Sequence, residues 1–222
     1  MTYVYKLSPR KKNPFFSFSV NTNIIFVNLL LFVVFTLLIY SNNSYMDYIA
    51  IKPSNIFHGN YLWTFITSMF MHGGVFHLLA NMFSLFFIGN LVQKIIGQKR
   101  YLWFYLISGL VAGLVFVLFS FIFQNDLNTY AVGASGALFG LVGFLVVITP
   151  NLPVYVMFIP IPIKMKYAGP GILLLLWLIS ITANIGIGNT AHLGGLIVGL
   201  IYGIYLKNKY KRKTAMIGKF FS

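Results

Sequence analysis

Four polar side chains in an otherwise apolar chain are of types that carry nucleophilic and acid–base chemistry. Ser135 lies between glycines in the stretch GASGALFG, and His192 lies near the start of AHLGGLIVGL. His77 and Asn81 are four residues apart in HLLAN, so they share one face of a helix. A serine becomes a nucleophile when a base takes its proton, and histidine serves as that base near neutral pH. The pattern predicts a Ser–His pair with two further hydrogen-bond donors.

Other kinds of chemistry known in membrane proteins need residues that this chain lacks. The chain has two acidic residues, Asp47 and Asp126, both in predicted loops, and it has no glutamate and no cysteine. Intramembrane aspartyl chemistry needs two carboxylates within the spans, and a zinc site of the H-E-x-x-H kind needs glutamate. Thiolate metal sites and disulfides need cysteine. We therefore predict no metal and no cofactor, and carboxylate-coupled transport lacks its intramembrane acids.

The elements that must position these residues are membrane helices. Of the 222 residues, 59% are hydrophobic and 8% are charged, whereas soluble domains are about 25% charged. The net charge of +14 comes mainly from clusters at 6–12, 94–100, 164–166 and 207–219, each beside an apolar segment. That placement is typical of topology signals and does not favour nucleic-acid binding.

Apolar runs bounded by charge, glycine or proline predict an all-α bundle of six transmembrane helices. The four basic clusters hold fifteen of the sixteen Lys and Arg residues, which places both termini in the cytoplasm. We expect a basic N-terminal segment at 1–21, a membrane domain at 22–206 and a basic cytoplasmic tail at 207–222. The predicted spans are 22–40, 76–96, 102–123, 135–149, 167–183 and 190–206.

Two connections between these spans are unusual. Residues 41–75 form a long outer loop rich in aromatic residues, which we expect to settle in the membrane interface. Residues 150–166 are apolar but contain four prolines, which block a regular helix. We predict an extended hairpin or bent segment there.

The four polar side chains fall at a common depth in the predicted bundle. The spans 76–96, 135–149 and 190–206 all run from the outside inward. The four residues lie thirteen to seventeen positions before the inner markers of their spans. At 1.5 Å per residue, this places them about 20–25 Å above the inner boundary. One layer of the bundle therefore gathers all four.

Glycine repeats predict close packing between the two helices that carry the serine and the histidine. Gly136 and Gly140 are four residues apart in one, and Gly195, Gly199 and Gly203 repeat at the same interval in the other. Such stripes of small residues let membrane helices approach closely. Contact along them would bring the serine and histidine side chains to hydrogen-bond distance.

The predicted start of a helix at Ser135 also offers a place for negative charge. The first N–H groups of a helix are unpaired, and the helix dipole favours anions there. The Ser135 N–H, His77 and Asn81 therefore predict an oxyanion hole. Gly133 and Gly136 give the backbone freedom for close approach.

In this order, the motifs resemble those of the rhomboid family of intramembrane serine proteases. HGGVFHLLANM resembles the family's H-x-x-x-x-H-x-x-x-N, which adds His72 to the site. GASG matches G-x-S-G, and AHLGGLIVG matches A-H-x-x-G-x-x-x-G. The resemblance covers about residues 55–206 and implies that Ser135 is the nucleophile and His192 the base.

The resemblance implies a minimal, prokaryotic type of six-helix bundle, with a water-filled cavity open to the extracytoplasmic side of the cell membrane. It implies substrates that are membrane-anchored proteins, cut within or beside a transmembrane helix. It also suggests that span 167–183 and the loop 184–189 act as a gate and cap, and that loop 41–75 is half submerged.

The chain departs from the family pattern at three positions. Phe139 stands where many relatives carry the tyrosine that stacks on the catalytic histidine, so its ring can stack but lacks the hydroxyl. Thr64 follows Trp63 where many relatives have arginine, and Ser68 replaces a histidine found in some bacterial members. None of these changes touches the Ser–His pair.

The sequence thus predicts an intramembrane serine endopeptidase acting on single-pass or other transmembrane proteins in a lipid bilayer, without nucleic acid. Two alternatives stay open. A non-catalytic rhomboid-like protein that binds membrane clients would have the same fold, and a small transporter would have similar composition. The natural substrate, its cleavage site and the oligomeric state are not predicted.

Overall fold

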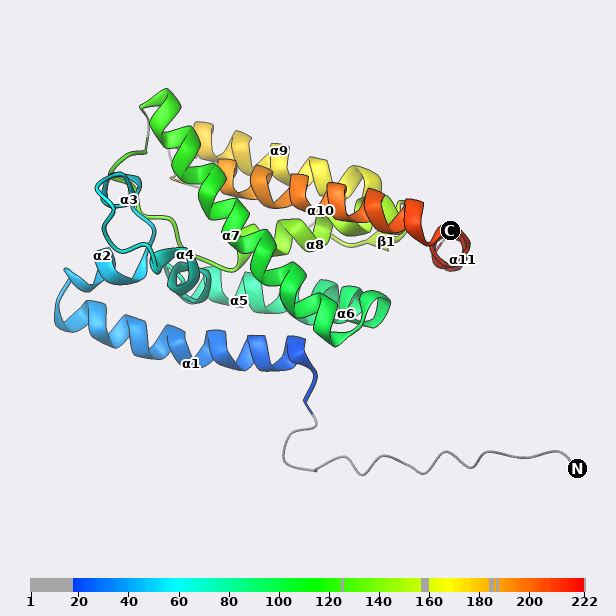
Figure 1. Ribbon diagram of the computed structural model, residues 1–222, viewed down its shortest axis with the longest axis horizontal. Coiled ribbons are helices and arrows are strands. Elements are labelled where there is room, and N and C mark those ends of the chain that lie inside the picture. Colours follow the sequence, from blue (N-terminus) through cyan, green and yellow to red (C-terminus); the bar gives the residue numbers. More distant parts are fainter. Residues whose placement is uncertain (1–17, 125, 157–159, 184–185, 187, 222) are drawn as a thin grey trace, which may run out of the picture.

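The computed structural model describes residues 18–124, 126–156, 160–183, 186 and 188–221. Within these residues the regular structure is almost entirely helical, which confirms the predicted all-α class (Figure 1). The helices form one bundle in which most long axes run in a similar direction, while α7 crosses the others at an angle.

Five helices are long and apolar enough to cross a membrane, and each matches a predicted span to within a few residues. The predicted span 135–149 forms α8 (Ser135–Ile148) to within one residue, and its 14 residues extend only about 21 Å, too short to count among the five. Six crossings and two cytoplasmic termini therefore stay predictions. The five helices are α1 (Val20–Ser41), Val75–Ile96, α7 (Gln98–Phe123), α9 (Met165–Ala183) and α10 (Asn189–Lys209).

The helix Val75–Ile96 is continuous but contains a wider π turn. At this turn the Leu85 carbonyl accepts a hydrogen bond of 2.8 Å from the Asn21 side-chain amide of α1. The Tyr101 hydroxyl of α7 donates to Asn21 Oδ1 at 2.5 Å, and Gln93 Oε1 accepts from the Asn21 N–H at 2.8 Å. This buried polar cluster ties three helices together. The pieces of the helix are α5 (Val75–Ser84), η3 (Leu85–Gly89) and α6 (Asn90–Ile96).

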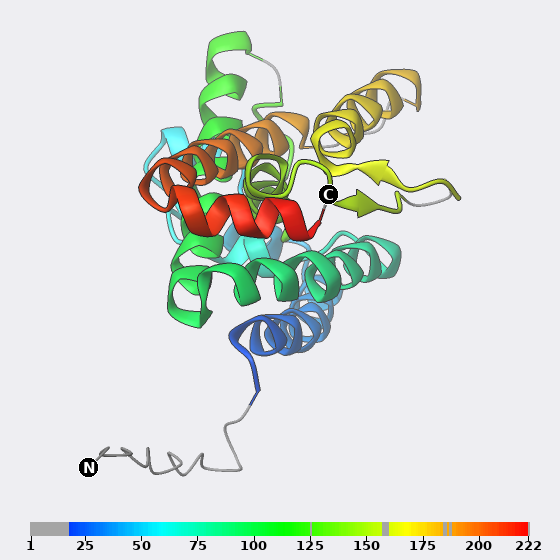
Figure 2. The same ribbon diagram turned by 90° about the vertical axis from the view of Figure 1, so that its right-hand side faces the viewer.

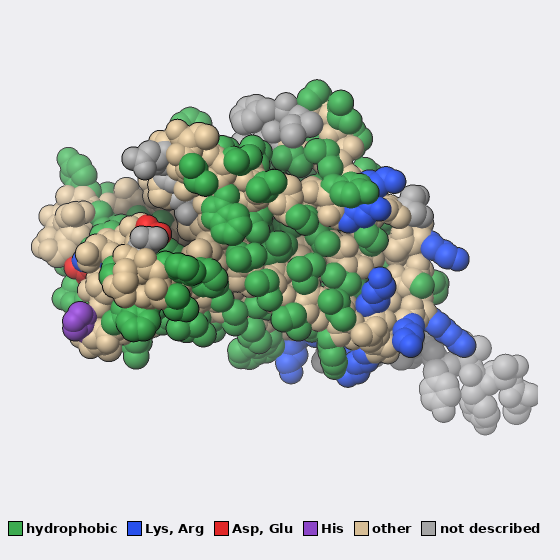
Figure 3. All heavy atoms as spheres, turned by 90° about the horizontal axis from the view of Figure 1, so that it is seen from above, with side chains coloured by type: hydrophobic (Ala, Val, Ile, Leu, Met, Phe, Trp, Pro, Cys, Tyr) green, Lys and Arg blue, Asp and Glu red, His purple; other side chains and the backbone are tan. Residues whose placement is uncertain are grey.

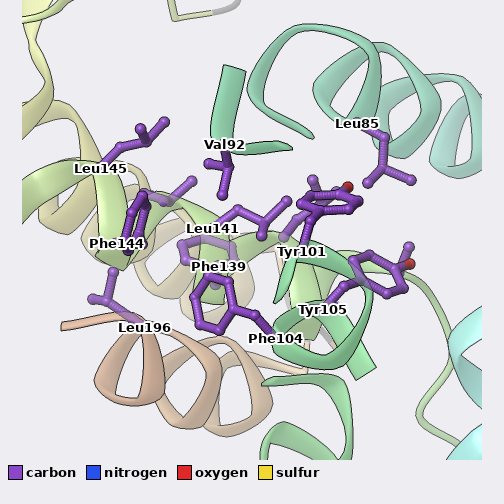
Figure 4. Close-up of a cluster of buried hydrophobic side chains, with 14 of the residues drawn as sticks. Leu85, Val92, Tyr101, Phe104, Tyr105, Phe139, Leu141, Phe144, Leu145 and Leu196 are labelled. Carbon is purple, nitrogen blue, oxygen red and sulfur yellow. The ribbon is translucent and has the colours of Figure 1, made fainter. Parts of the chain in front are cut away.

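Helix α8 lies at the centre of the bundle. Eleven of its 14 residues are buried, and α7, α9 and α10 surround it. A helix that is apolar all round is suited to burial in protein rather than contact with water. Phe144 and Leu141 pack there against side chains of α7 and α10, including Phe104 and Leu196 (Figure 4).

The predicted glycine stripes form the contact between α8 and α10. A side chain at Gly195 would collide with the Gly136 carbonyl, and one at Gly199 with the Gly140 carbonyl. A Cβ at Gly199 would also lie 2.7 Å from the Phe144 backbone nitrogen. The two backbones are therefore in direct contact, which fixes the register between the two helices.

The long loop after α1 is folded rather than extended. The Trp63 indole N–H donates to the Tyr48 carbonyl at 2.9 Å, and Thr64, in the place where many relatives have arginine, is fully buried. The position of this loop in the membrane interface stays a prediction. The loop contains α2 (Tyr45–Ile49), α3 (Pro53–Phe57), α4 (Thr64–Thr67) and the 3-10 turn η2 (Ser68–Phe70).

The proline-rich segment 150–166 contains the predicted hairpin. Strands β1 (Pro153–Val154) and β2 (Ile163–Lys164) pair in antiparallel fashion, with Pro153 opposite Lys164. Residues 157–159, at the tip, lie outside the described residues.

The two ends of the membrane domain differ from the predicted boundaries. Helix α1 begins at Val20, inside the predicted segment 1–21, of which residues 1–17 are not described. Helix α10 continues to Lys209, beyond the predicted end at residue 206. The predicted tail then forms a further helix, α11 (Lys211–Phe220), that lies across the end of the bundle (Figure 2).

Candidate active site

Ser135 and His192 come together where α8 and α10 begin. Ser135 is the first residue of α8, and its Oγ lies 2.8 Å from Nε2 of His192. His192 lies in the first turn of α10, where its N–H donates to the Gly188 carbonyl at 3.0 Å. The glycine contact aligns the pair, because Gly136 follows Ser135 and Gly195 lies one short turn after His192.

The His192 ring is oriented by packing on one side and by the serine on the other. The Phe139 ring stacks on it with centroids 4.6 Å apart and an interplanar angle of 23°. Among the described residues, no side chain or backbone group hydrogen-bonds His192 Nδ1. When Nε2 accepts the Ser135 proton, Nδ1 must carry the ring proton of the neutral form. The Ser135 hydroxyl and the His192 ring are therefore hydrogen-bonded to each other without a carboxylate.

His77 presents an N–H toward the space beside the serine. Its Nδ1 accepts a hydrogen bond of 3.4 Å from the Gly73 N–H, so the ring proton lies on Nε2. A carbon atom built onto Gly133 would be 2.9 Å from His77 Nε2 and 3.6 Å from Ser135 Oγ. The space over Gly133 is therefore within reach of both the nucleophile and a donor.

The other two predicted site residues take different positions. The Asn81 side chain lines a cavity that Ser135 and His77 also line. Its Nδ2 donates to the His77 carbonyl at 2.8 Å, so one of its two amide hydrogens remains for another acceptor. His72 is 1% exposed and packs edge-on against His77, with centroids 5.2 Å apart. Burial, and then the neighbouring His77, lower the pKa of His72 to about 4, so it is neutral at pH 7. His72 supports the His77 ring and does not line the cavity.

A cavity of about 730 Å³ connects the predicted site residues. Ser135, His192, His77 and Asn81 all contribute to its walls, and so do residues of α9. Its volume is in the usual range of ligand sites in proteins, about 300–1,000 Å³. Ser135 therefore lies at the wall of a cavity of the size that ligand sites have.

The family model of the Rhomboid domain matches residues 59–209. The chain belongs to the rhomboid family. It is 36% identical over 159 residues to RHOMBOID-like protein 1 of Arabidopsis thaliana, an alignment that covers 69% of this chain and 37% of the relative. It is 30% identical to two bacterial proteins, Rhomboid protease AarA of Providencia stuartii, with 69% of this chain and 59% of the relative covered, and Rhomboid protease GluP of Bacillus subtilis, with 62% and 24% covered.

This rhomboid chain is an integral multi-pass membrane protein by its family and its five apolar helices. It spans less than half the length of the first curated relatives that it matches.

Sequence reasoning missed an electrostatic tie at Asp47, which connects the long loop to the segment before Ser135 through hydrogen bonds and an ion pair. Asp47 Oδ1 accepts hydrogen bonds from the Tyr130 hydroxyl at 2.8 Å and from the Asn55 amide at 2.9 Å. Lys52 Nζ lies 3.6 Å from the same carboxylate. The chain has only two acidic residues, and because both lie in predicted loops, the sequence did not single out Asp47.

Backbone hydrogen bonds extend the same tie to the serine. Ile51 and Ala131 exchange two of them, at 3.1 and 2.8 Å, as in an antiparallel strand pair. The Gly133 N–H then donates to the Ser68 carbonyl at 2.8 Å. The loop therefore fixes the path of the chain up to two residues before the nucleophile.

We expect Asp47→Asn to loosen this segment. Hydrogen bonds to a charged acceptor are about twice as strong as neutral ones, so amide exchange in 127–133 should accelerate about fivefold. Hydrogen–deuterium exchange read by mass spectrometry measures this. Asp126→Asn removes the same charge from a side chain that, within the described residues, bonds only to the nearby Thr129, so it should leave the exchange of 130–133 unchanged. Equal acceleration in both variants would refute the tie.

The tie should also depend on pH. Burial raises the pKa of Asp47, but the hydrogen bonds from Tyr130 and Asn55 and the charge of Lys52 lower it further, so that the pKa lies below its usual 3.8. A depressed pKa stabilises the folded loop above about pH 4, and this stabilisation is lost as the pH falls through the folded pKa. Below that pH, wild type and Asp47→Asn should exchange alike after correction for intrinsic rates.

Gly133→Ala should inactivate the site while the bundle stays folded. The φ of Gly133 is +119°, which L side chains rarely adopt, and the added Cβ would lie 2.9 Å from the His77 ring. The alanine therefore displaces either His77 or the backbone from the space beside Ser135. We expect at least about a 10²-fold loss of turnover, the usual effect of losing one oxyanion donor. Turnover near the wild-type level would show that this space is not used.

Proposed function

We propose that this rhomboid is an intramembrane serine endopeptidase. The observation that carries the proposal is the 2.8 Å contact between Ser135 Oγ and His192 Nε2, at the wall of a cavity inside a bundle of membrane helices. Two relatives that are named rhomboid proteases, in Providencia stuartii and Bacillus subtilis, support the same activity.

The proposed reaction uses the dyad twice. Ser135 Oγ attacks the carbonyl carbon of the scissile peptide bond while His192 Nε2 takes the hydroxyl proton. The carbonyl oxygen becomes an oxyanion, and the Ser135 N–H and the His77 Nε2–H stabilise it, with the second Asn81 amide hydrogen as a further donor. His192 then gives its proton to the leaving amine, and the acyl group stays on Ser135. Water, deprotonated by His192, hydrolyses this ester and restores the serine.

The proposed substrates are single-pass or other transmembrane proteins in the lipid bilayer. The cavity is lined by both α5 and α9, so a substrate segment entering between these helices would reach Ser135. The buried residues of α9 are Met165, Ala168, Gly169 and Leu173, all in its first half. Its second half is therefore held less firmly, which supports a gating movement of α9. Of the proposed cap, 184–189, residues 184, 185 and 187 lie outside the described residues.

We further propose that the site opens to the extracytoplasmic side. Lys and Arg gather at one end of the molecule, while the acidic residues lie at the other (Figure 3). Ser135 begins α8 at the end of the bundle away from the basic groups. Because cytoplasmic loops carry the excess of Lys and Arg, this arrangement supports an outward-facing site.

Labelling with a fluorophosphonate tests the proposal without knowledge of the natural substrate, because the probe reacts only with an activated serine. We expect labelling of the detergent-purified protein that maps to Ser135 and disappears in Ser135→Ala and His192→Ala. Each variant must retain the thermal unfolding profile of the wild type. Folded wild-type protein that takes up no label would contradict the proposal and favour the non-catalytic, client-binding alternative.

A further inference from the structure

A second cavity, of about 360 Å³, lies at the end of α8 opposite to Ser135. It is enclosed between the last residues of α8, the end of α10 and one face of α11. Its polar walls are Lys207, Asn208, Lys211 and Thr214. Its apolar walls include Val147, Ile148 and Pro150.

The charge in this cavity is positive and is not neutralised by the protein. The ammonium groups of Lys207 and Lys211 have no hydrogen bond or ion pair with the residues that the structure describes. The neighbouring Lys209 differs, because its Nζ donates to the Tyr205 hydroxyl at 2.8 Å and lies over two aromatic rings. The cavity therefore concentrates two unpaired cations and is complementary to an anion.

Helix α11 places this cavity at the boundary of the membrane. The helix lies across the end of the bundle, close to perpendicular to α10, where the apolar spans end (Figures 1 and 2). Ile217 anchors it on the core, while Met216 and Phe220 are 72% and 80% exposed. A basic helix with exposed apolar side chains is typical of helices that lie in the lipid headgroup layer.

We propose that this cavity binds the phosphodiester headgroup of an anionic phospholipid. Lys207 and Lys211 pair with the phosphate, and the Asn208 amide supplies a further donor. Val147 and Pro150 accommodate the first methylenes of an acyl chain. A free phosphate is also an anion, but these apolar walls and the position at the membrane boundary favour the lipid. The site is about the length of α8 from Ser135 and takes no part in the proposed hydrolysis.

Native mass spectrometry of the full-length protein in a neutral detergent tests this site. Phosphatidylglycerol should be retained, and phosphatidylcholine, which carries no net charge, should not. The double variant Lys207→Gln/Lys211→Gln should bind phosphatidylglycerol about 25-fold more weakly, at about fivefold for each lysine. The control Lys164→Gln/Lys166→Gln removes the same charge from the same end of the protein but outside the cavity, and it should change binding less than twofold.

A steric pair of variants separates shape from charge. A Cβ at Gly218 would meet only the Ile148 carbonyl, at 3.5 Å, so Gly218→Ala fits and should bind as the wild type does. Gly218→Leu extends into the cavity with every cation in place, and it should weaken phosphatidylglycerol binding at least tenfold. Both variants must keep the wild-type unfolding temperature. If Gly218→Leu unfolds the protein, the two lysine pairs decide the question.

Three results would overturn the proposal. Equal losses in the two lysine pairs would mean that the basic end attracts lipid only diffusely. Binding of phosphatidylcholine as tightly as phosphatidylglycerol would show that the site does not select a headgroup of net negative charge. Inorganic phosphate that binds as tightly as phosphatidylglycerol would identify a phosphate site instead. None of these readouts requires turnover, so they are independent of the proposed protease activity.

Discussion

His192→Ala is expected to lower the turnover of a membrane-anchored reporter protein by at least about 10³-fold. Nε2 of His192 lies 2.8 Å from Ser135 Oγ, and it is the only base that we assign to the serine. Without it, the hydroxyl must attack with its proton in place. The reporter is reconstituted with the protein in liposomes, and its cleavage is followed over time. The variant should bind the reporter as the wild type does.

Combining the two substitutions gives a stricter test of the proposed dyad. Ser135→Ala should cost as much as His192→Ala, and the double variant should cost no more than either, because the two side chains act as one unit. Phe139→Tyr keeps the stacked ring over His192 and serves as the matched control, with turnover close to that of the wild type. Additive losses in the double variant, or full activity in either single variant, would contradict the dyad mechanism.

Gly199→Ala is expected to cause a large loss of stability. The added methyl group would overlap the Gly140 carbonyl and approach the Phe144 nitrogen to 2.7 Å, and neither backbone atom can rotate away as a side chain would. Overpacking a tight core costs about 3 kcal/mol or somewhat more. For a domain of this size, the midpoint of thermal unfolding should fall by about 6–12 °C.

The control for this experiment is another glycine to alanine change in a membrane helix. A Cβ at Gly171 of α9 would meet no atom within 4 Å. Because alanine is the better helix former, Gly171→Ala should leave the midpoint unchanged or raise it slightly. If Gly199→Ala unfolds at the wild-type temperature, the helices α8 and α10 do not pack with their backbones in contact.

Features that depend on residues close together in the sequence were predictable. Apolar runs locate the membrane helices because a span must satisfy its backbone internally and bury about twenty apolar residues. The glycine interval of four predicts the contact between α8 and α10, because it repeats close to the helical period. That contact is present along Gly136, Gly140, Gly195 and Gly199. The proximity of Ser135 and His192 follows from this register alone.

The lengths and bends of the helices depended on their surroundings. Nothing in the run 76–96 marks the π turn at Leu85, which exists because Asn21 of another helix takes its carbonyl. The segment 207–222 was predicted only as a basic tail, and most of it forms α11, in which Ile217 packs against the core.

The sequence by itself determined the class of fold, the glycine contact and the set of residues in the candidate site. Only the tertiary structure decided how they are oriented: Gly73 fixes the proton of His77, and Asp47 holds Tyr130, which is 83 positions away in the chain. The physical reason is the separation in sequence over which each property is determined. Helical periodicity and hydropathy are properties of neighbouring residues, whereas a hydrogen bond between distant loops depends on the whole packed bundle, and no local pattern encodes it.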